Sequence, residues 1–264
     1  MRVCLIQLAY DDDESLAERT RRVAGLVREQ AGADLVVLPE LWSAGGFSYR
    51  EWPERSQDVR GEVAQALAAA AADAGVWLHG GSIAERPDSG ETGPEGKSLW
   101  NTSLVFSPSG ELLATYRKIH RFGFAGGEPK LMEAGTDLVF LDAVGLRAGL
   151  STCYDLRFPE LYRAQLDQGA TAFVIPAAWP MARLDAWRLL LRARAVENQC
   201  LVLGCNTAGT HAGTQMAGHS AVVAPTGEVL AEAGDDQEVL RVDFDVDTIA
   251  AFRQDFPVLA DRRL

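Results

Sequence analysis

The sequence predicts an α/β protein in which two mixed β-sheets pack face to face with helices outside. Apolar segments of strand length alternate with amphipathic helical segments, and two further pairs of apolar segments flank short turns, as in antiparallel hairpins. At 264 residues, 47% of them hydrophobic, the chain is long enough to bury a sizeable core. Since no linker divides it, we expect residues 1–264 to form one domain.

In the first part of the chain, strands and helices alternate. We predict buried strands where a short run is apolar on both alternating faces. We predict helices where apolar residues recur three and four positions apart and a glycine follows. These patterns predict, in order, a strand over 2–9, a helix over 14–31, a strand over 34–39, a helix over 56–74 and a strand over 76–84.

The middle of the chain contains a hairpin between two irregular segments. Residues 86–98 are rich in proline, glycine and charge and predict an exposed loop. Strands over 103–107 and 111–118 flank a Pro-Ser-Gly turn. Residues 119–137 are Gly-rich and lack periodicity. Irregular segments of that length in a compact domain are usually functional or disordered.

The second half repeats features of the first. It predicts strands over 146–153, 172–179, 199–205 and 239–245, helices over 159–169, 181–198 and 247–254, and a hairpin over 220–233. The hairpin segments VFSPSGELLA and VVAPTGEVLA are alike, and so are VVLPELW and FVIPAAW. We therefore expect two pseudo-symmetric halves, each contributing a sheet and helices.

Composition excludes several classes of protein. A net charge of −12 leaves no basic face to neutralise phosphates, so no nucleic-acid partner is expected. The first apolar run is too short for a secretory signal, and no stretch has the length of a membrane-spanning helix, so we expect a cytoplasmic location. The four cysteines lack CxxC spacing, which argues against disulfides or structural zinc. Cys200 and Cys205, five residues apart in a strand, should point to opposite faces.

Three reactive side chains stand at the ends of apolar strands or just beyond them, where a rigid sheet can hold them. They are Glu40, Lys118 and Cys153. A lone cysteine is more often a buried structural residue, and a lone glutamate at a strand end is usually solvated. Together, however, they make chemical sense: the carboxylate takes the thiol proton, and the ammonium stabilises an oxyanion beside the backbone N–H of Tyr154. We expect the following helix N-terminus and a nearby cation to lower the pKa of Cys153.

Other catalytic motifs fit the sequence less well. GKS at residues 96–98 lacks the earlier glycine of a phosphate-binding loop, because Glu91 stands there. HGGS at residues 79–82 is similar to an oxyanion-hole motif of serine hydrolases, but the chain has no G-x-S-x-G elbow. A Cys-His pair drawn from the four histidines is a weaker alternative, since His79 and His219 flank strands and have plausible packing roles.

The strings VVLPELW, YRKIH and STCYDLRFPELYR, in this order, resemble the signatures of the nitrilase superfamily, also called carbon–nitrogen hydrolases. The resemblance extends over nearly the whole chain and implies a four-layer α-β-β-α sandwich that forms homodimers or larger oligomers and uses no metal or organic cofactor. It further implies that Glu40 is the general base, Lys118 the oxyanion residue and Cys153 the nucleophile that forms a thioester. A second glutamate of the family aligns best with Glu128, with Glu133 as the alternative.

CYDLRFPELYR, PAAWP and RARAVENQ most resemble the ω-amidase-like group, which implies a short ω-amide of a dicarboxylic acid, such as 2-oxoglutaramate, as the substrate. Arg157 is then a candidate for binding the substrate carboxylate, although a salt bridge inside its own loop fits equally well. Tyr154 and Trp179 are candidates for the pocket wall.

N-carbamoyl-amino-acid hydrolysis, deaminated-glutathione cleavage and nitrile hydrolysis use the same trio and stay open as alternatives. A catalytically silent binding or scaffold subunit is the alternative from another class. We expect the C-terminal helix and tail, residues 245–264, to take part in subunit contacts.

Overall fold

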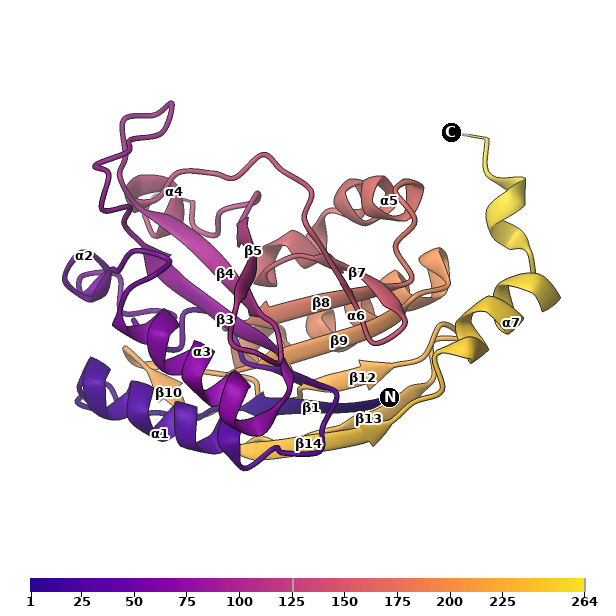
Figure 1. Ribbon diagram of the computed structural model, residues 1–264. Coiled ribbons are helices and arrows are strands. Elements are labelled where there is room, and N and C mark those ends of the chain that lie inside the picture. The colour runs from indigo at the N-terminus through magenta and orange to yellow at the C-terminus, as the bar shows by residue number, and fades with distance from the viewer. Residues whose placement is uncertain (125, 264) are drawn as a thin grey trace.

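The computed structural model describes residues 1–124 and 126–263, and two six-stranded sheets dominate it (Figure 1). The first sheet has the order β14-β1-β2-β3-β4-β5. Its strands are β1 (Arg2–Gln7), β2 (Leu35–Val37), β3 (Trp77–Glu85), β4 (Trp100–Phe106), β5 (Leu112–Arg117) and β14 (Glu238–Asp243). β1, β2 and β3 run parallel, whereas β14, β4 and β5 pair antiparallel with their neighbours. The sheet is therefore mixed, as predicted.

The second sheet has the order β13-β12-β9-β8-β7-β6. Its strands are β6 (Phe140–Ala143), β7 (Leu146–Leu150), β8 (Ala172–Ala177), β9 (Leu201–Asn206), β12 (Ala221–Val223) and β13 (Val229–Glu232). Here β7, β8 and β9 run parallel, while β6, β12 and β13 are antiparallel additions.

The two sheets repeat one topology, as the paired sequence segments predict. Each has three parallel strands, a hairpin on one side (β4–β5 or β12–β13) and one antiparallel strand on the other (β14 or β6). In this correspondence β2 matches β8, so the turn after VVLP matches the turn after FVIP. Glu40 lies on the first of these turns, and Ala178 lies on the second.

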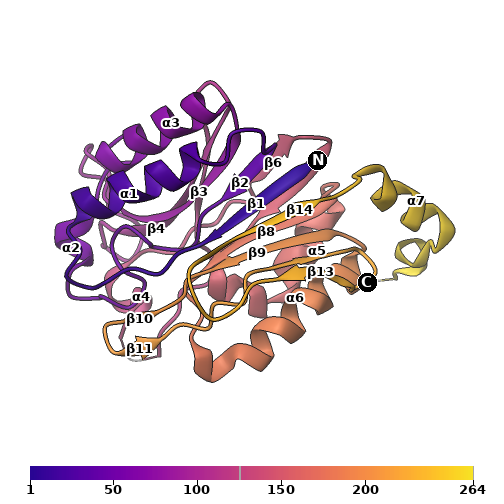
Figure 2. The same cartoon turned by 90° about the horizontal axis from the view of Figure 1, so that it is seen from below.

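Helices cover the outer face of each sheet, which gives four layers in the order helix, sheet, sheet, helix (Figure 2). α1 (Leu16–Arg28) and α3 (Glu62–Ala74) pack on the first sheet, and α5 (Pro159–Asp167) and α6 (Leu184–Asn198) on the second. α7 (Asp247–Asp255) follows β14 at the edge of the sandwich.

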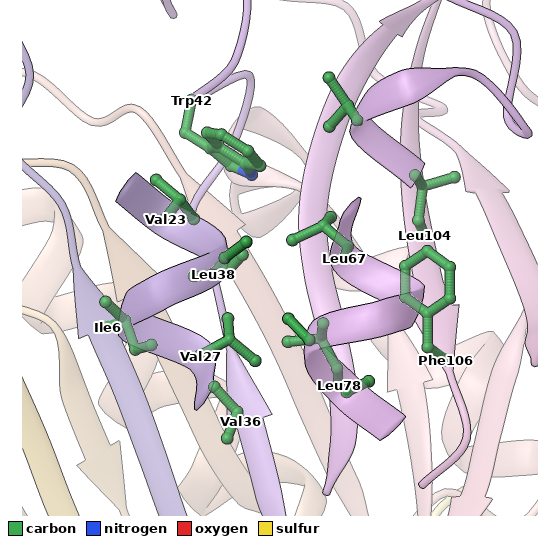
Figure 3. Packing of buried hydrophobic residues seen from close by; sticks show 14 of the residues in the cluster. Ile6, Val23, Val27, Val36, Leu38, Trp42, Leu67, Leu78, Leu104 and Phe106 are labelled. Carbon is green, nitrogen blue, oxygen red and sulfur yellow. The ribbon is translucent and has the colours of Figure 1, made fainter. Parts of the chain in front are cut away.

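Strand alternation divides the core into three apolar layers. In β1, Ile6 faces α1 and α3, whereas Leu5 faces the second sheet. Figure 3 shows the outer layer, where Val23 and Val27 of α1 lie over Ile6 and Val36. Cys200 and Cys205 belong to different layers, as their odd spacing predicts, and all four cysteines are free and buried.

Several short elements differ from the prediction. The predicted helix over 56–74 begins only at Glu62, and a separate short helix α2 (Trp52–Arg55) precedes it. The strand predicted over 146–153 ends at Leu150, because Cys153 already belongs to a 3-10 helix, η1 (Cys153–Arg157). β6, the one-turn helix α4 (Glu128–Leu131) and the two-residue strands β10 (Thr210–His211) and β11 (Thr214–Gln215) are additional. Such short segments carry too little periodicity to be recognised.

Two smaller 3-10 helices, η2 (Met181–Arg183) and η3 (Val258–Asp261), precede α6 and follow α7. In the part of the chain that the structure describes, no helix combines the length and apolar character needed to cross a membrane.

Candidate active site

The structure brings Glu40, Lys118 and Cys153 together, although 113 residues separate the first from the last. Glu40 follows β2, Lys118 follows β5, and Cys153 opens η1 beyond β7. Lys118 Nζ lies 2.7 Å from Glu40 Oε1, and all three residues line one hollow. All three are at least nine-tenths buried, so their charges act on one another with little screening by water.

Glu128 joins the group from the irregular segment before β6. Its Oε2 lies 2.8 Å from Lys118 Nζ, and its carboxylate also accepts the backbone N–H of Phe122. Glu133 lies elsewhere: its Oε1 accepts the backbone N–H groups of Glu95 and Lys97, both at 2.9 Å. Glu133 therefore ties down the loop over residues 86–98, and Glu128 is the second glutamate beside Lys118.

The turn that carries Glu40 depends on a bulge in β3. The strand register shifts between His79 and Ser82, and Ser82 Oγ accepts the backbone N–H of Leu41 at 3.0 Å. Gly81 has a φ of +67°, and a Cβ there would lie 2.0 Å from the carbonyl oxygen of Pro39. The HGGS segment, residues 79–82, therefore packs against the turn that carries Glu40 and supports it.

Glu40 itself is fixed by the matching turn of the other sheet. Its Oε2 accepts the backbone N–H of Ala178 at 2.9 Å, just after β8, and its own N–H donates to the Ala177 carbonyl at 3.4 Å. One carboxylate oxygen therefore faces Lys118 while the other is held by the second sheet.

The Cys153 turn is built around a buried carboxylate that the sequence did not single out. Cys153 has a φ of +47°, in the left-handed region that non-glycine residues seldom occupy. Asp155 stabilises the turn because its Oδ2 accepts the N–H of Thr152 and the hydroxyl of Tyr116, at 2.8 and 2.7 Å. Its Oδ1 accepts the N–H of His120 at 2.8 Å, which links the cysteine turn to the segment after Lys118.

Burial and charge shift the ionisation of the cluster. Burial alone would lower the pKa of Lys118, but the charges of Glu128 and Glu40 outweigh it and hold that pKa well above its ordinary value. Burial raises the pKa of the Glu128 carboxyl, and Lys118 offsets this only in part.

The expectation of a lowered pKa for Cys153 is wrong. Burial raises the pKa of its thiol well above the ordinary value, the charge of Glu40 raises it further, and Lys118 only partly compensates. Moreover, Cys153 opens a 3-10 helix of five residues and not the first turn of α5, which begins at Pro159. The thiol of the free protein is therefore protonated, and it needs a base to become a nucleophile.

A second hollow adjoins the first and shares Phe47, Phe122, Cys153 and Ala178 with it. It contains all three predicted substrate-binding residues, Tyr154, Arg157 and Trp179. The guanidinium carbon of Arg157 lies 4.8 Å from the centre of the Trp179 ring. Among the described residues, Arg157 has no ion pair or side-chain hydrogen bond, so the alternative of a salt bridge inside its loop is not found there.

Sequence reasoning missed several residues around the two hollows. Phe47 and Phe122 line both hollows, and Arg183 lines the one with Arg157. They come from irregular segments or the start of a helix, where no periodic pattern marks them. An aromatic residue in a Gly-rich loop, such as Phe122, was the available signal.

A Cys-His pair is not formed among the described residues. None of the four histidines lines either hollow. His79 lies inside the protein in β3, and His219 contacts Glu232 and Asp235. Within residues 1–124 and 126–263, no group of three or more His, Cys, Asp and Glu side chains is arranged to hold a metal ion.

A buried thiol beside a carboxylate and an ammonium, at the strand ends of a four-layer sandwich, is the arrangement expected of a hydrolase with a thiol nucleophile. Comparison with known proteins agrees. Residues 2–254 match the carbon-nitrogen hydrolase family, so the chain belongs to this family and is a hydrolase of carbon–nitrogen bonds other than peptide bonds.

Individual relatives are similar over nearly the whole chain. A 2-oxoglutaramate amidase of Paenarthrobacter nicotinovorans is 44% identical, with 99% of this chain and 89% of the relative covered. The omega-amidase NIT2 of Homo sapiens is 36% identical, with 99% and 95% covered. A solved structure of a variant amidase from Nesterenkonia sp., in which acrylamide has added to the active-site cysteine, is 27% identical with a TM-score of 0.82, covering 97% of this chain and 98% of that one.

Proposed function

We propose that this protein is an ω-amidase that hydrolyses the terminal amide of a short dicarboxylic acid monoamide, such as 2-oxoglutaramate, through a thioester on Cys153. The observation that carries the proposal is that Cys153 lines two adjoining hollows whose other linings differ. One contains the carboxylate and ammonium groups, and the other contains a half-buried arginine without an ionic partner among the described residues. Relatives named for this activity support it.

In the first half of the reaction, the thiol loses its proton to Glu40 as Sγ attacks the amide carbon. The oxygen of the tetrahedral intermediate gains negative charge, and Lys118 Nζ and the backbone N–H of Tyr154 stabilise it. Glu40 then gives the proton to the amide nitrogen, ammonia leaves, and the acyl group stays on sulfur. Since the pKa of Cys153 is raised, the base is essential for this step.

In the second half, Glu40 takes a proton from water, whose oxygen attacks the thioester carbon. Collapse of that intermediate breaks the carbon–sulfur bond, and the proton returns to the sulfur, so that the dicarboxylic acid is released and the thiol is restored. Glu128 keeps Lys118 charged throughout, because its carboxylate raises the pKa of the lysine.

Arg157 provides the selectivity of this scheme. Its guanidinium can bind a carboxylate in a two-pronged manner. Trp179 and Tyr154 line the same hollow as Arg157 and Cys153 and can contact the carbon chain of the substrate. The amide carbon then lies at the sulfur while the acid end of the substrate lies at the arginine.

The test is ammonia release from 2-oxoglutaramate by the purified protein and by a Cys153→Ala variant. We expect activity in the first and none in the second, with an acyl adduct on Cys153 seen by intact-protein mass spectrometry. An active alanine variant overturns the mechanism. Carbon dioxide released with ammonia from N-carbamoyl acids, or turnover of nitriles or deaminated glutathione but not of ω-amides, assigns another substrate class. Absence of any turnover and of preferential Cys153 labelling by iodoacetamide favours a silent scaffold.

We also propose that the protein works as a homodimer or larger homo-oligomer, with the C-terminal helix and tail in the subunit contacts. Exposed apolar side chains support this, since Leu189 and Val196 on α6 are 68% and 51% exposed and Phe256 at the end of α7 is 57% exposed. Sedimentation equilibrium checks the assembly. Because a thiol nucleophile works only when reduced, we further propose a cytoplasmic location.

A further inference from the structure

Asn101 contacts Glu40, Glu128 and Lys118 without lining either hollow. It is the second residue of β4 and only 2% exposed. Its side-chain nitrogen donates to Glu40 Oε1 at 2.8 Å and to Glu128 Oε1 at 2.6 Å. Its backbone carbonyl accepts the N–H of Lys118 at 2.8 Å.

Asn101 and Lys118 bridge the same two carboxylates. Lys118 Nζ also contacts Glu40 Oε1 and Glu128 Oε1, at 2.7 and 3.1 Å, so each of these oxygens accepts from both donors. The result is a closed square of two acceptors and two donors. A carboxylate in this square cannot rotate without losing two hydrogen bonds.

The orientation of the Asn101 amide leaves one of its polar atoms unsatisfied, which lowers the stability of the fold. Its Oδ1 is buried and has no hydrogen-bond partner among the described residues. Turning the amide over would direct Oδ1 at two carboxylate oxygens, which only accept, so the observed orientation is the favourable one. An unsatisfied buried oxygen lowers stability, and its presence here is explained if the two hydrogen bonds on the other side serve the reaction.

The uncharged amide of Asn101 also suits the electrostatics of the carboxylate pair. Two carboxylate groups share one ammonium, and a second cation would neutralise them and weaken Glu40 as a base. A neutral amide fixes the geometry of the two carboxylates without neutralising them, so Glu40 can still accept a proton as a base.

We propose that Asn101 is a positioning residue that holds Glu40 and Glu128 in one arrangement around Lys118 and keeps the pair available as carboxylates during the reaction at Cys153. The proposal rests on the function proposed above for this site. Asn101 touches neither the substrate hollow nor the sulfur, so it acts through the two glutamates.

The pH dependence of the reaction reports this role directly. The titratable groups around the carboxylate pair are Lys118, Cys153, Tyr10 and Tyr49. The pKa values of Lys118, Cys153 and Tyr10 are raised, and burial together with the two glutamates raises the pKa of Tyr49 to about 12. Because all of these pKa values lie on the alkaline side, these groups do not contribute to the acid limb of the rate profile.

The test uses Asn101→Ala and Asn101→Asp in the full chain, with kcat/KM for 2-oxoglutaramate measured between pH 5 and 9. The alanine variant lacks both hydrogen bonds, and the aspartate variant keeps the shape but turns the donor into an acceptor. In the alanine variant we expect the acid limb to move up by about one pH unit, since a hydrogen bond to a charged group is of that size. In the aspartate variant we expect it to move further, because a third carboxyl beside the pair favours protonation. We expect kcat at pH 8 to fall roughly 10- to 100-fold, as for other residues that orient reactive groups.

The matched control is Asn198→Ala. Asn198 is also fully buried, also has an Oδ1 without a partner among the described residues, and donates at 2.9 Å to the Arg194 carbonyl, outside both hollows. Its replacement should change the melting temperature while leaving the acid limb in place. If both Asn101 variants keep the wild-type pH profile, or the control shifts it equally, the proposal is wrong.

A readout without turnover separates this proposal from the proposed function. Acrylamide has added to the active-site cysteine in a Glu→Gln variant of the Nesterenkonia amidase. Because the thiolate is the nucleophile, this addition also requires removal of the thiol proton. The pH dependence of its rate, followed by intact mass, should show the same upward shift in the Asn101 variants. A wild-type protein inactive on ω-amides overturns the substrate assignment alone, whereas unshifted acrylamide profiles overturn the role of Asn101.

Discussion

At the scale of single residues, the protonation of the site depends on how strongly its charged groups shift one another's pKa values. Lys118 would lose its proton readily as an isolated buried amine, and it stays charged because two glutamates flank it. The pKa of Cys153 is raised as well, because burial and the negative charge of Glu40 hold the proton on its thiol. At rest, the site therefore holds a protonated thiol on Cys153 and a charged ammonium on Lys118.

Replacement of Glu128 by glutamine tests whether this residue keeps Lys118 charged. Glu128 contributes most to raising the pKa of Lys118, so its removal lowers that pKa, and the lysine loses its proton at a lower pH. We expect the alkaline limb of kcat/KM to move to lower pH and kcat to fall roughly 100-fold. A pH-rate profile from 6 to 11 measures both.

Glu133→Gln is the control for this variant. Glu133 is equally buried, but it accepts backbone N–H groups of the loop over residues 86–98, and a glutamine oxygen can accept them too. Its pH profile should match the wild type. An unchanged alkaline limb in Glu128→Gln would show that Glu128 does not hold the proton on Lys118.

At the scale of elements, the site is built from strand ends that other strands support. The bulge in β3 brings Ser82 beneath the turn after β2, and the second sheet holds Glu40 through Ala178. A change in the bulge should therefore reach the catalytic group without touching it.

Gly81→Ala tests this support. The new Cβ would lie 2.0 Å from the Pro39 oxygen, so the turn that carries Glu40 must move. We expect a loss of more than about 2 kcal/mol in the free energy of unfolding, from backbone strain together with overpacking, and a clear loss of kcat. Urea unfolding and steady-state kinetics measure the two effects.

Gly75→Ala is a close match, because Gly75 has the same φ of +67° at the end of α3 but nothing within 4 Å of an added Cβ. It should show the cost of the left-handed backbone alone, about 1 kcal/mol, with normal activity. Equal losses in the two variants would mean that the contact with Pro39 contributes nothing.

At the scale of the whole molecule, sequence patterns predict the long elements and their arrangement. Two mixed sheets, outer helices and paired halves follow from runs such as VVLPELW and FVIPAAW, and the family comparison confirms this fold. Glu40, Lys118 and Cys153 stand out because each is a reactive residue at the end of an apolar strand or just beyond it.

What the sequence does not reveal is the depth and surroundings of each group. The pKa of Cys153 is predicted in the wrong direction, because the extent of burial and the approach of Glu40 arise only on folding. Asn101 and Asp155 carry no sign of their roles, since an amide in a strand and an acid in a turn are usually structural or solvated. β6 is missed because its four residues are too few for a pattern.

The packing of the two sheets buries a histidine, and this predicts acid sensitivity of the whole fold. His79 lies in β3, fully buried, with Nδ1 accepting the N–H of Gly81 at 3.3 Å and Nε2 unpartnered among the described residues. Burial lowers its pKa from 6.5 to about 4. Between pH 4 and pH 6.5, His79 binds a proton in the unfolded chain but not in the folded protein. The contribution of His79 to the free energy of unfolding is therefore fully present above pH 6.5 and decreases as the pH falls towards 4.

Protonation of one such histidine in the unfolded chain lowers the free energy of unfolding by roughly 3 kcal/mol at pH 4. The slope is about 1.4 kcal/mol per pH unit. His79→Asn keeps an acceptor near the Nδ1 position but cannot titrate, so its free energy of unfolding should fall less steeply than that of the wild type between pH 6.5 and 4. Urea unfolding at several pH values measures the difference. His211, whose pKa burial also lowers to about 4, gives an independent repetition. Parallel pH curves for His79→Asn and the wild type would mean that His79 takes up no proton on unfolding, contrary to its buried, neutral state between the sheets.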